Sequence, residues 1–120
     1  MVNDRKVLLR SVISLDSHFS ESVQKLRRLP WDSPEVVVLT PVDIVLVLSR
    51  YVSGELTSDV VEEWANALEC REDVGFPESQ REAVQQAVFE LANPVVTQAL
   101  SPARAKELLV GISAATYPAL

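Results

Sequence analysis

The sequence predicts an all-α domain, and three observations lead to this prediction. The apolar residues are mostly Leu, Val and Ala, only three glycines occur, and apolar residues recur with helical spacing along several segments. A chain of 120 residues is long enough to enclose one continuous core. We expect a single-domain bundle of about five helices, with a long N-terminal helix over residues 1–29, a connector over 30–39, a helical core over 40–112 and a tail over 113–120.

An amphipathic stripe predicts the N-terminal helix. Apolar residues separated by three or four positions follow one another along residues 4–29: Leu8, Val12, Leu15, Phe19, Val23, Leu26 and Leu29. In an alternative interpretation, Asp16 and Ser17 cap a second helix, because Asp and Ser side chains favour helix starts. Pro30 and Pro34 end the helical region. The connector that follows is expected to be loop, although its run of valines at 36–38 favours an extended segment.

The next helix is expected over residues 41–52. Thr40 is its predicted cap, Pro41 takes the first helical position, and the acid Asp43 takes the third, where the helix dipole favours negative charge. The segment is apolar on nearly all sides, which predicts the central buried helix. Its β-branched residues leave a buried strand as the alternative, but the cap and the stop at Gly54 favour a helix.

A further helix is predicted to begin after the cap Thr57. Its inward stripe consists of Val60, Val61, Trp64, Ala67 and Leu68. Its outward residues are Asp59, Glu62, Glu63, Asn66 and Glu69. We interpret Trp64 as a core residue, whereas Trp31 in the connector is either a plug over the core or an exposed contact residue.

Two more helices complete the predicted bundle. Ser79 and Glu82 have the spacing of a capping box, and the helix behind them is expected to run to about residue 92, where Asn93-Pro94 ends it. Ser101 and Pro102 then open the last helix as cap and first-turn proline.

Negative charge is concentrated in one window of the sequence. Residues 55–82 hold nine acids and two bases, an excess larger than the net charge of −6 for the whole chain. The face is therefore either a solubility surface or a binding surface for a basic protein partner. Under the second interpretation the contact residues are Glu55, Asp59, Glu62, Glu63, Asn66, Glu69, Glu72 and Asp73.

The composition argues against several classes of chemistry. One histidine, His18, and one cysteine, Cys70, supply neither a catalytic pair nor a zinc site, and no EF-hand or phosphate-binding glycine loop occurs. We therefore expect no enzyme activity, no metal and no cofactor. A pI near 4.7 argues against nucleic-acid binding. No export or membrane-spanning segment is recognisable, which with the single cysteine predicts a cytoplasmic protein.

A central segment resembles small bacterial immunity proteins. The residues that carry the resemblance are Tyr51-Val52-Ser53-Gly54-Glu55-Leu56-Thr57, followed by Glu63-Trp64-Ala65-Asn66 and then 69–73. Proteins of the colicin D immunity type and relatives that accompany contact-dependent toxins are similar short helical chains, and the likeness extends over residues 40–112. It implies a stoichiometric inhibitor whose acidic residues occupy the basic active site of a toxin, often a nuclease.

Two other functional classes remain open. A homo-oligomeric helical module would bury apolar residues that lie off the main stripes, for which Leu9, Ile13 and Phe89 are candidates; we expect a monomer or a homodimer. A small enzyme with a carboxylate site is the other class, and it predicts that one acid, for example Glu69, titrates above the usual range of Glu.

Overall fold

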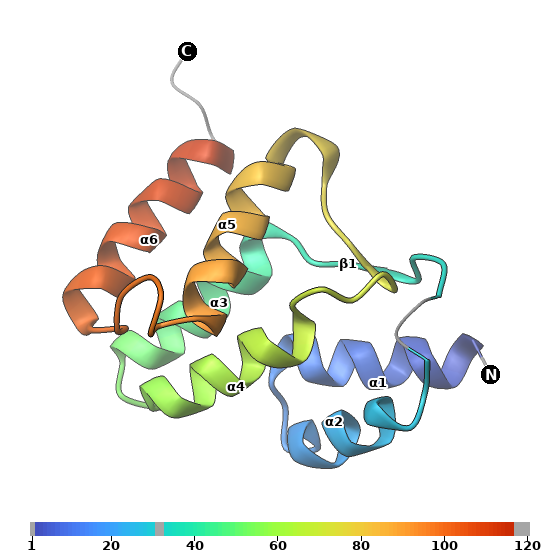
Figure 1. Ribbon diagram of the computed structural model, residues 1–120. Coiled ribbons are helices and arrows are strands. Elements are labelled where there is room, and N and C mark those ends of the chain that lie inside the picture. Colours follow the sequence, from blue (N-terminus) through green and yellow to red (C-terminus); the bar gives the residue numbers. More distant parts are fainter. Residues whose placement is uncertain (1, 31–32, 117–120) are drawn as a thin grey trace.

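The computed structural model describes residues 2–30 and 33–116. Within these ranges the chain forms six α-helices, two short strands and one 3-10 turn, which pack as a compact, mostly helical single domain (Figure 1). In chain order the elements are α1 (Val2–Ser14), α2 (Phe19–Arg27), β1 (Val37–Val38), α3 (Pro41–Val52), α4 (Ser58–Leu68), β2 (Val74–Gly75), η1 (Glu78–Gln80), α5 (Arg81–Ala92) and α6 (Pro102–Thr116).

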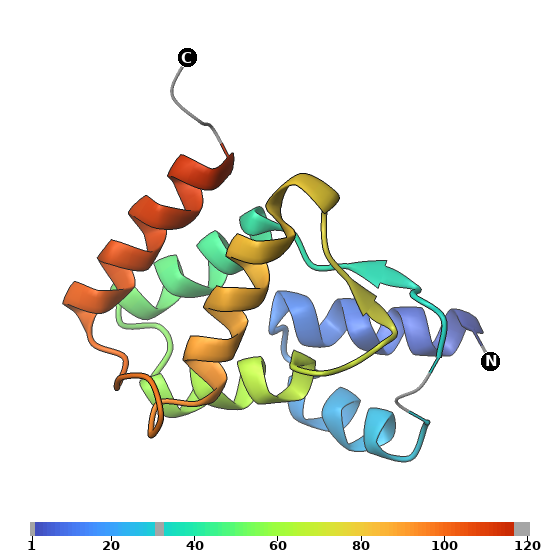
Figure 2. The same cartoon turned by 45° about the horizontal axis from the view of Figure 1, so that its top comes forward.

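The helices form two groups that share α4. The α1–α2 hairpin lies on one side, and α3 packs against α6 on the other, while α4 packs against both α5 and α1 (Figures 1 and 2). The core sits where α1, α3, α4 and α5 meet, around the fully buried side chains of Trp64, Leu9, Ile44 and Leu48. None of the helices in the described ranges has both the length and the apolar character that crossing a membrane requires.

The prediction of one long N-terminal helix is wrong. Helix α1 ends at Ser14, Leu15 adopts a φ of +50°, and α2 begins at Phe19. Asp16 stabilises the break, because its Oδ1 accepts hydrogen bonds from the Ser11 hydroxyl at 2.6 Å and from the His18 backbone N–H at 2.9 Å. These bonds compete with the continuous helical ladder. The second helix of the alternative interpretation is present, but its N-cap is His18 and no side chain caps it, so Asp16 and Ser17 do not cap α2 as that interpretation assumed.

The hairpin changes which N-terminal residues are buried. The stripe residues Val12 and Phe19 point into the core as predicted, but Leu9 and Ile13 are also buried, at 0% and 3% exposure. Because the chain folds back after α1, one side of this helix faces α2 and another faces α3 and α4. Leu9 and Ile13 are therefore core residues and are unavailable as an oligomer interface.

The all-α prediction requires one correction. Strands β1 and β2 form a two-stranded parallel sheet in which Val37 pairs with Val74 and Val38 with Gly75 (Figure 2). Val37 and Val38 are thus a strand, as the valine run favoured, whereas residues 33–36 and 39 of the connector have no regular structure, as expected of a loop. The pairing partner of this strand lies almost forty residues further along the chain, so no local pattern indicates the pair.

Helix α3 has the predicted start but not the predicted burial. The Thr40 hydroxyl accepts from the Asp43 N–H at 3.4 Å, and Asp43 Oδ2 accepts from the Thr40 N–H at 2.8 Å, which completes a capping box. Gly54 has a φ of +88° just after the helix, as a glycine stop requires. Because packing covers only part of its circumference, Val42 and Leu46 are more than half exposed. The helix is not fully buried.

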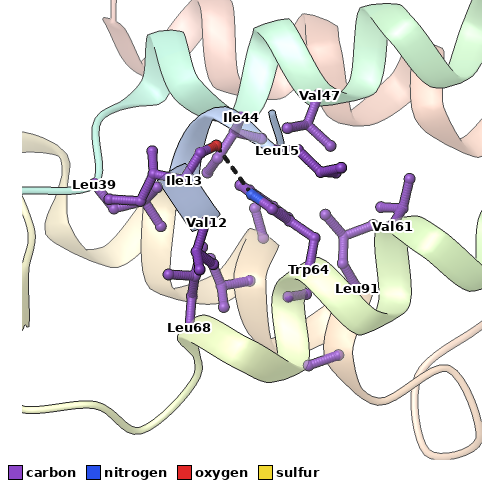
Figure 3. Close-up of a cluster of buried hydrophobic side chains, with 14 of the residues drawn as sticks. Val12, Ile13, Leu15, Leu39, Ile44, Val47, Val61, Trp64, Leu68 and Leu91 are labelled. Atoms are coloured by element: carbon purple, nitrogen blue, oxygen red, sulfur yellow. Dashed lines mark hydrogen bonds between the residues drawn. The ribbon is translucent and has the colours of Figure 1, made fainter. Parts of the chain in front are cut away.

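Helix α4 places Trp64 in the core, as predicted. Thr57 caps the helix through its hydroxyl, which accepts from the Val60 N–H at 3.3 Å. The Trp64 side chain has no exposed surface, and its indole N–H donates to the Ile13 carbonyl at 3.0 Å (Figure 3). This bond satisfies a carbonyl in the last turn of α1, where no helical partner remains. Trp64 therefore joins α4 to α1.

The predicted capping box of α5 is wrong, whereas the cap of α6 is confirmed. The turn η1 precedes α5, and no side chain caps the helix. At α6 the Ser101 hydroxyl accepts from the Arg104 N–H at 3.1 Å. This helix continues to Thr116, so residues 113–116 of the predicted tail are helical. The rest of that tail, 117–120, and the interpretation of Trp31 lie outside the described residues.

Candidate functional site

The outward face of α4 carries the largest group of unpaired acids among the predicted contact residues. The 3.6-residue period turns Val61, Trp64, Ala65 and Leu68 inward, and it leaves Asp59, Glu63 and Asn66 exposed and Glu62 half-buried. We call Asp59, Glu62, Glu63 and Asn66 the α4 ridge. Their side chains form no hydrogen bond or ion pair with any described residue. The ridge therefore presents three carboxylates whose charge nothing within the described chain neutralises.

A groove runs along one flank of this ridge, between α4 and α2. Its volume is about 830 Å³. The four ridge residues form one wall, Arg27 of α2 lies on the other, and the turn after α4 closes the end with Glu69, Cys70 and Arg71. The floor is apolar and consists of Val23, Leu26 and Ala67. We call this cavity the α2/α4 groove.

A smaller hollow borders the other flank of α4. It encloses about 190 Å³ between the start of α4, the end of α5 and residues 94–100. Asp59 and Glu62 line both this hollow and the α2/α4 groove. The N-terminal half of α4 is therefore a protruding acidic edge with a depression on each side.

Three other predicted contact residues lie around the ridge with different partners. Glu69 is half-buried and accepts from the Asn93 amide at 2.9 Å, which connects the end of α4 to the end of α5. Glu55, which follows α3, forms an ion pair with Arg50 of that helix. Glu72 is exposed and has no partner among the described residues. Glu69 and Glu55 thus have structural contacts of their own.

Asp73 is not part of the exposed face, contrary to the sequence-based expectation. Its side chain has no exposed surface and accepts from Arg5 at 2.7 Å and from Arg71 at 2.8 Å through each oxygen. Burial raises the pKa of the Asp73 carboxyl, but the hydrogen bonds from Arg71 and Arg5 outweigh it and hold the pKa below its ordinary value. The Asp73 carbonyl also accepts from the backbone of β1. Asp73 therefore stabilises the fold where α1, β1 and β2 meet.

Sequence reasoning missed the basic residues of the groove. Arg27 follows the buried Leu26 directly, and the local pattern gives no indication that its side chain faces α4. Arg71 stands two residues before Asp73, a spacing that allows its fork of donors to reach that carboxylate. The Arg71–Asp73 pair could have been predicted from the sequence, whereas the position of Arg27 depends on the packing of α2.

The one cysteine and the one histidine of the chain lie in different parts of the described structure. No three His, Cys, Asp or Glu side chains within the described ranges form a group that could hold a metal ion. Cys70 is exposed at the end of the α2/α4 groove, whereas His18 is exposed beside a separate cavity between α1 and α2. The two residues therefore do not share a cavity.

Comparison with known proteins gives no relative, since no protein-family model, curated protein or solved structure matches this chain. The function must therefore be inferred from the α4 ridge and its surroundings.

Proposed function

We propose that this protein is a stoichiometric inhibitor, of the immunity-protein kind, that binds a basic protein partner through the α4 ridge and occludes the partner's active site. The observation that carries the proposal is the set of three unpaired carboxylates, Asp59, Glu62 and Glu63, on an edge with a hollow on either side. The free thiol of Cys70 is compatible with a reducing compartment such as the cytoplasm.

The charge of the ridge has an energetic consequence for the unbound protein. Carboxylates four residues apart on a helix, such as Asp59 and Glu63, repel each other by a few tenths of a kcal/mol, and no base on α4 offsets this. A basic partner would remove the repulsion on binding. The same charge would accelerate encounter with a basic surface, by as much as several decades at low salt.

The shape of the ridge suits a concave partner surface. A helix edge that projects between two hollows can enter a cleft, whereas a flat acidic surface can only cover its rim. Basic clefts are typical of enzymes that act on nucleic acids, because the bases of the cleft neutralise the phosphates of the substrate. Acids that enter such a cleft would replace those phosphates, which is why a nuclease-like partner is proposed.

Charge reversal on the ridge tests the proposal. The variant Glu62→Lys/Glu63→Lys is compared with Glu78→Lys/Glu82→Lys, which changes net charge equally but lies in η1 and the first turn of α5. The parent protein and the two variants are each used to capture partners from the source cell's lysate at low and high salt. We expect one stoichiometric basic partner, released by salt, whose affinity falls roughly 100-fold in the ridge variant and changes little in the control.

Two measurements accompany the capture. Circular dichroism establishes that both variants retain the helical content of the parent protein. An activity assay of the captured partner, with and without the inhibitor, tests occlusion directly. Equal capture by the ridge variant and the parent would exclude the α4 ridge as the binding surface.

The homo-oligomeric alternative receives less support. Of its three predicted interface residues, Leu9 and Ile13 are buried, and only Phe89 is exposed, at 45%.

A further inference from the structure

The α2/α4 groove carries opposite charges on its two walls. The α4 wall has the carboxylates of Asp59, Glu62 and Glu63, and the α2 wall has the guanidinium of Arg27. Arg27 is exposed and forms no ion pair with any described residue, even though unpaired acids lie across the groove. A segment bound in the groove would therefore meet negative charge on its α4 side and positive charge on its α2 side.

Two neighbouring basic residues, Arg71 and Lys25, are already engaged and do not neutralise the acidic wall. Arg71 donates to both carboxylate oxygens of Asp73, and Lys25 pairs with Glu21 on its own helix at 3.3 Å. Arg27 is thus the one unpaired base among the described residues that line the groove. Arg27 therefore makes the α2 side of the groove favour an acidic flank of a bound segment, whereas the α4 side favours a basic flank.

The walls and floor favour a helix over an extended segment. Both walls are helices whose backbone groups bond internally, so the groove offers no sheet edge to an extended chain. An extended occupant would leave its own backbone groups unpaired over the apolar floor of Val23, Leu26 and Ala67. A helix satisfies its backbone groups and can place an apolar stripe on that floor.

We propose that the α2/α4 groove binds an amphipathic helix of the partner, with an apolar stripe on the floor, basic residues toward α4 and an acidic residue toward Arg27. This inference rests on the proposed function and specifies which part of the partner enters beside the ridge. Turning such a helix end for end exchanges its basic and acidic flanks. Arg27 therefore makes the two directions unequal, so that the groove accepts the helix in one direction.

Two helix-stabilised synthetic peptides of about 14 residues, or about 21 Å of helix, serve as probes. Both have a leucine stripe; the first has Lys and Arg on one flank and Glu on the other, and the second has Lys and Arg on both flanks. They are titrated into the full-length protein, and amide chemical shifts report the site. We expect both to shift the amides of Leu26 and Ala67, and the first to bind more tightly.

Arg27→Glu is the decisive variant, and Arg28→Glu is its control. Arg28 is the adjacent base, is also exposed, and does not line the groove. Arg27→Glu is expected to weaken the first peptide about tenfold and to strengthen the second, because both walls become acidic. Arg28→Glu should leave the order of the two affinities unchanged.

The outcomes separate this inference from the proposed function. If Arg27→Glu leaves the preference unchanged, or if the shifts lie outside the groove, the groove inference is overturned while capture through the ridge can still stand. If Glu62→Lys/Glu63→Lys does not reduce capture of the partner, the proposed function falls whatever the peptides do. A reversal of peptide preference by Arg27→Glu alone supports the inference.

Discussion

Single residues show how much a sequence-level charge count depends on tertiary partners. Asp73 belongs to the acidic window 55–82, but it is buried between Arg5 and Arg71, whose side chains are only 13% and 12% exposed. A carboxylate in such a place stabilises the fold only as long as it is ionised and paired. Its negative charge is not available to a partner protein.

Replacing Asp73 by Asn should destabilise the protein by about 3 kcal/mol at pH 7, because two arginines then lose their shared anion. The paired carboxyl has a pKa below its ordinary value of 3.8. Its contribution is therefore complete above about pH 4 and is lost as the pH falls through the lowered pKa. Urea denaturation at pH 7 and at about pH 3 should show the gap between parent and variant narrowing in acid.

The neighbouring Glu72 provides the control for this measurement. It is exposed and has no partner among the described residues, so Glu72→Gln should change the free energy of unfolding by less than about 0.5 kcal/mol. An Asp73→Asn variant as stable as Glu72→Gln would contradict the buried ion pairs.

Helix ends are decided partly by local sequence and partly by the turn that precedes them. Thr40, Thr57 and Ser79 all stand where the sequence predicts a cap. Only the first two accept a hydrogen bond from the first turn of their helix. At Ser79 the chain forms the 3-10 turn η1, which displaces the start of α5 to Arg81.

Three alanine variants distinguish real caps from the predicted one. Thr40→Ala and Thr57→Ala should each lower the free energy of unfolding by about 1 kcal/mol, since a backbone N–H loses its acceptor. Ser79→Ala should lie within about 0.5 kcal/mol of the parent. Chemical denaturation of the three proteins measures these changes. If Ser79→Ala lowered the free energy of unfolding as much as Thr40→Ala, Ser79 would be a cap of α5 after all.

At the scale of the whole molecule, long-range polar contacts attach the α1–α2 hairpin to the remaining helices. Arg5 of α1 bonds to Asp73, Trp64 of α4 bonds to the Ile13 carbonyl, and Arg50 of α3 donates to the carbonyls of Ser14 and Leu15 at 3.1 Å each. A guanidinium at the C-terminal end of α1 also complements the helix dipole. These contacts position α2 and therefore one wall of the groove.

Removing the Arg50 contact should loosen the hairpin without unfolding the protein. We expect Arg50→Met to lower the free energy of unfolding by about 2 kcal/mol, because two carbonyls lose a charged donor. Hydrogen exchange should accelerate in the last turn of α1 and at the start of α2. Arg81→Met, at an exposed base without a partner among the described residues, is the control. Unchanged exchange at α1 would show that Arg50 does not hold the hairpin.

Local sequence determined the parts of this protein whose physics is short-range. The caps at Thr40, Thr57 and Ser101, the stop at Gly54, the burial of Trp64 and the outward direction of the α4 acids all follow from signals within a few residues. The partner role of those acids remains a proposal, because nothing in a helical pattern indicates what a charged face meets.

Only the tertiary structure decided the contacts between distant segments. The pairing of β1 with β2, the burial of Asp73 by Arg5, and the position of Arg27 across from α4 each join residues more than thirty positions apart. Local sequence alone allows many alternative contacts between distant segments. Which of them form depends on how all the apolar faces of the helices pack together. The sequence therefore determined helices α3, α4 and α6 and the outward direction of the α4 acids, whereas packing determined the small sheet, the burial of Asp73 and the groove.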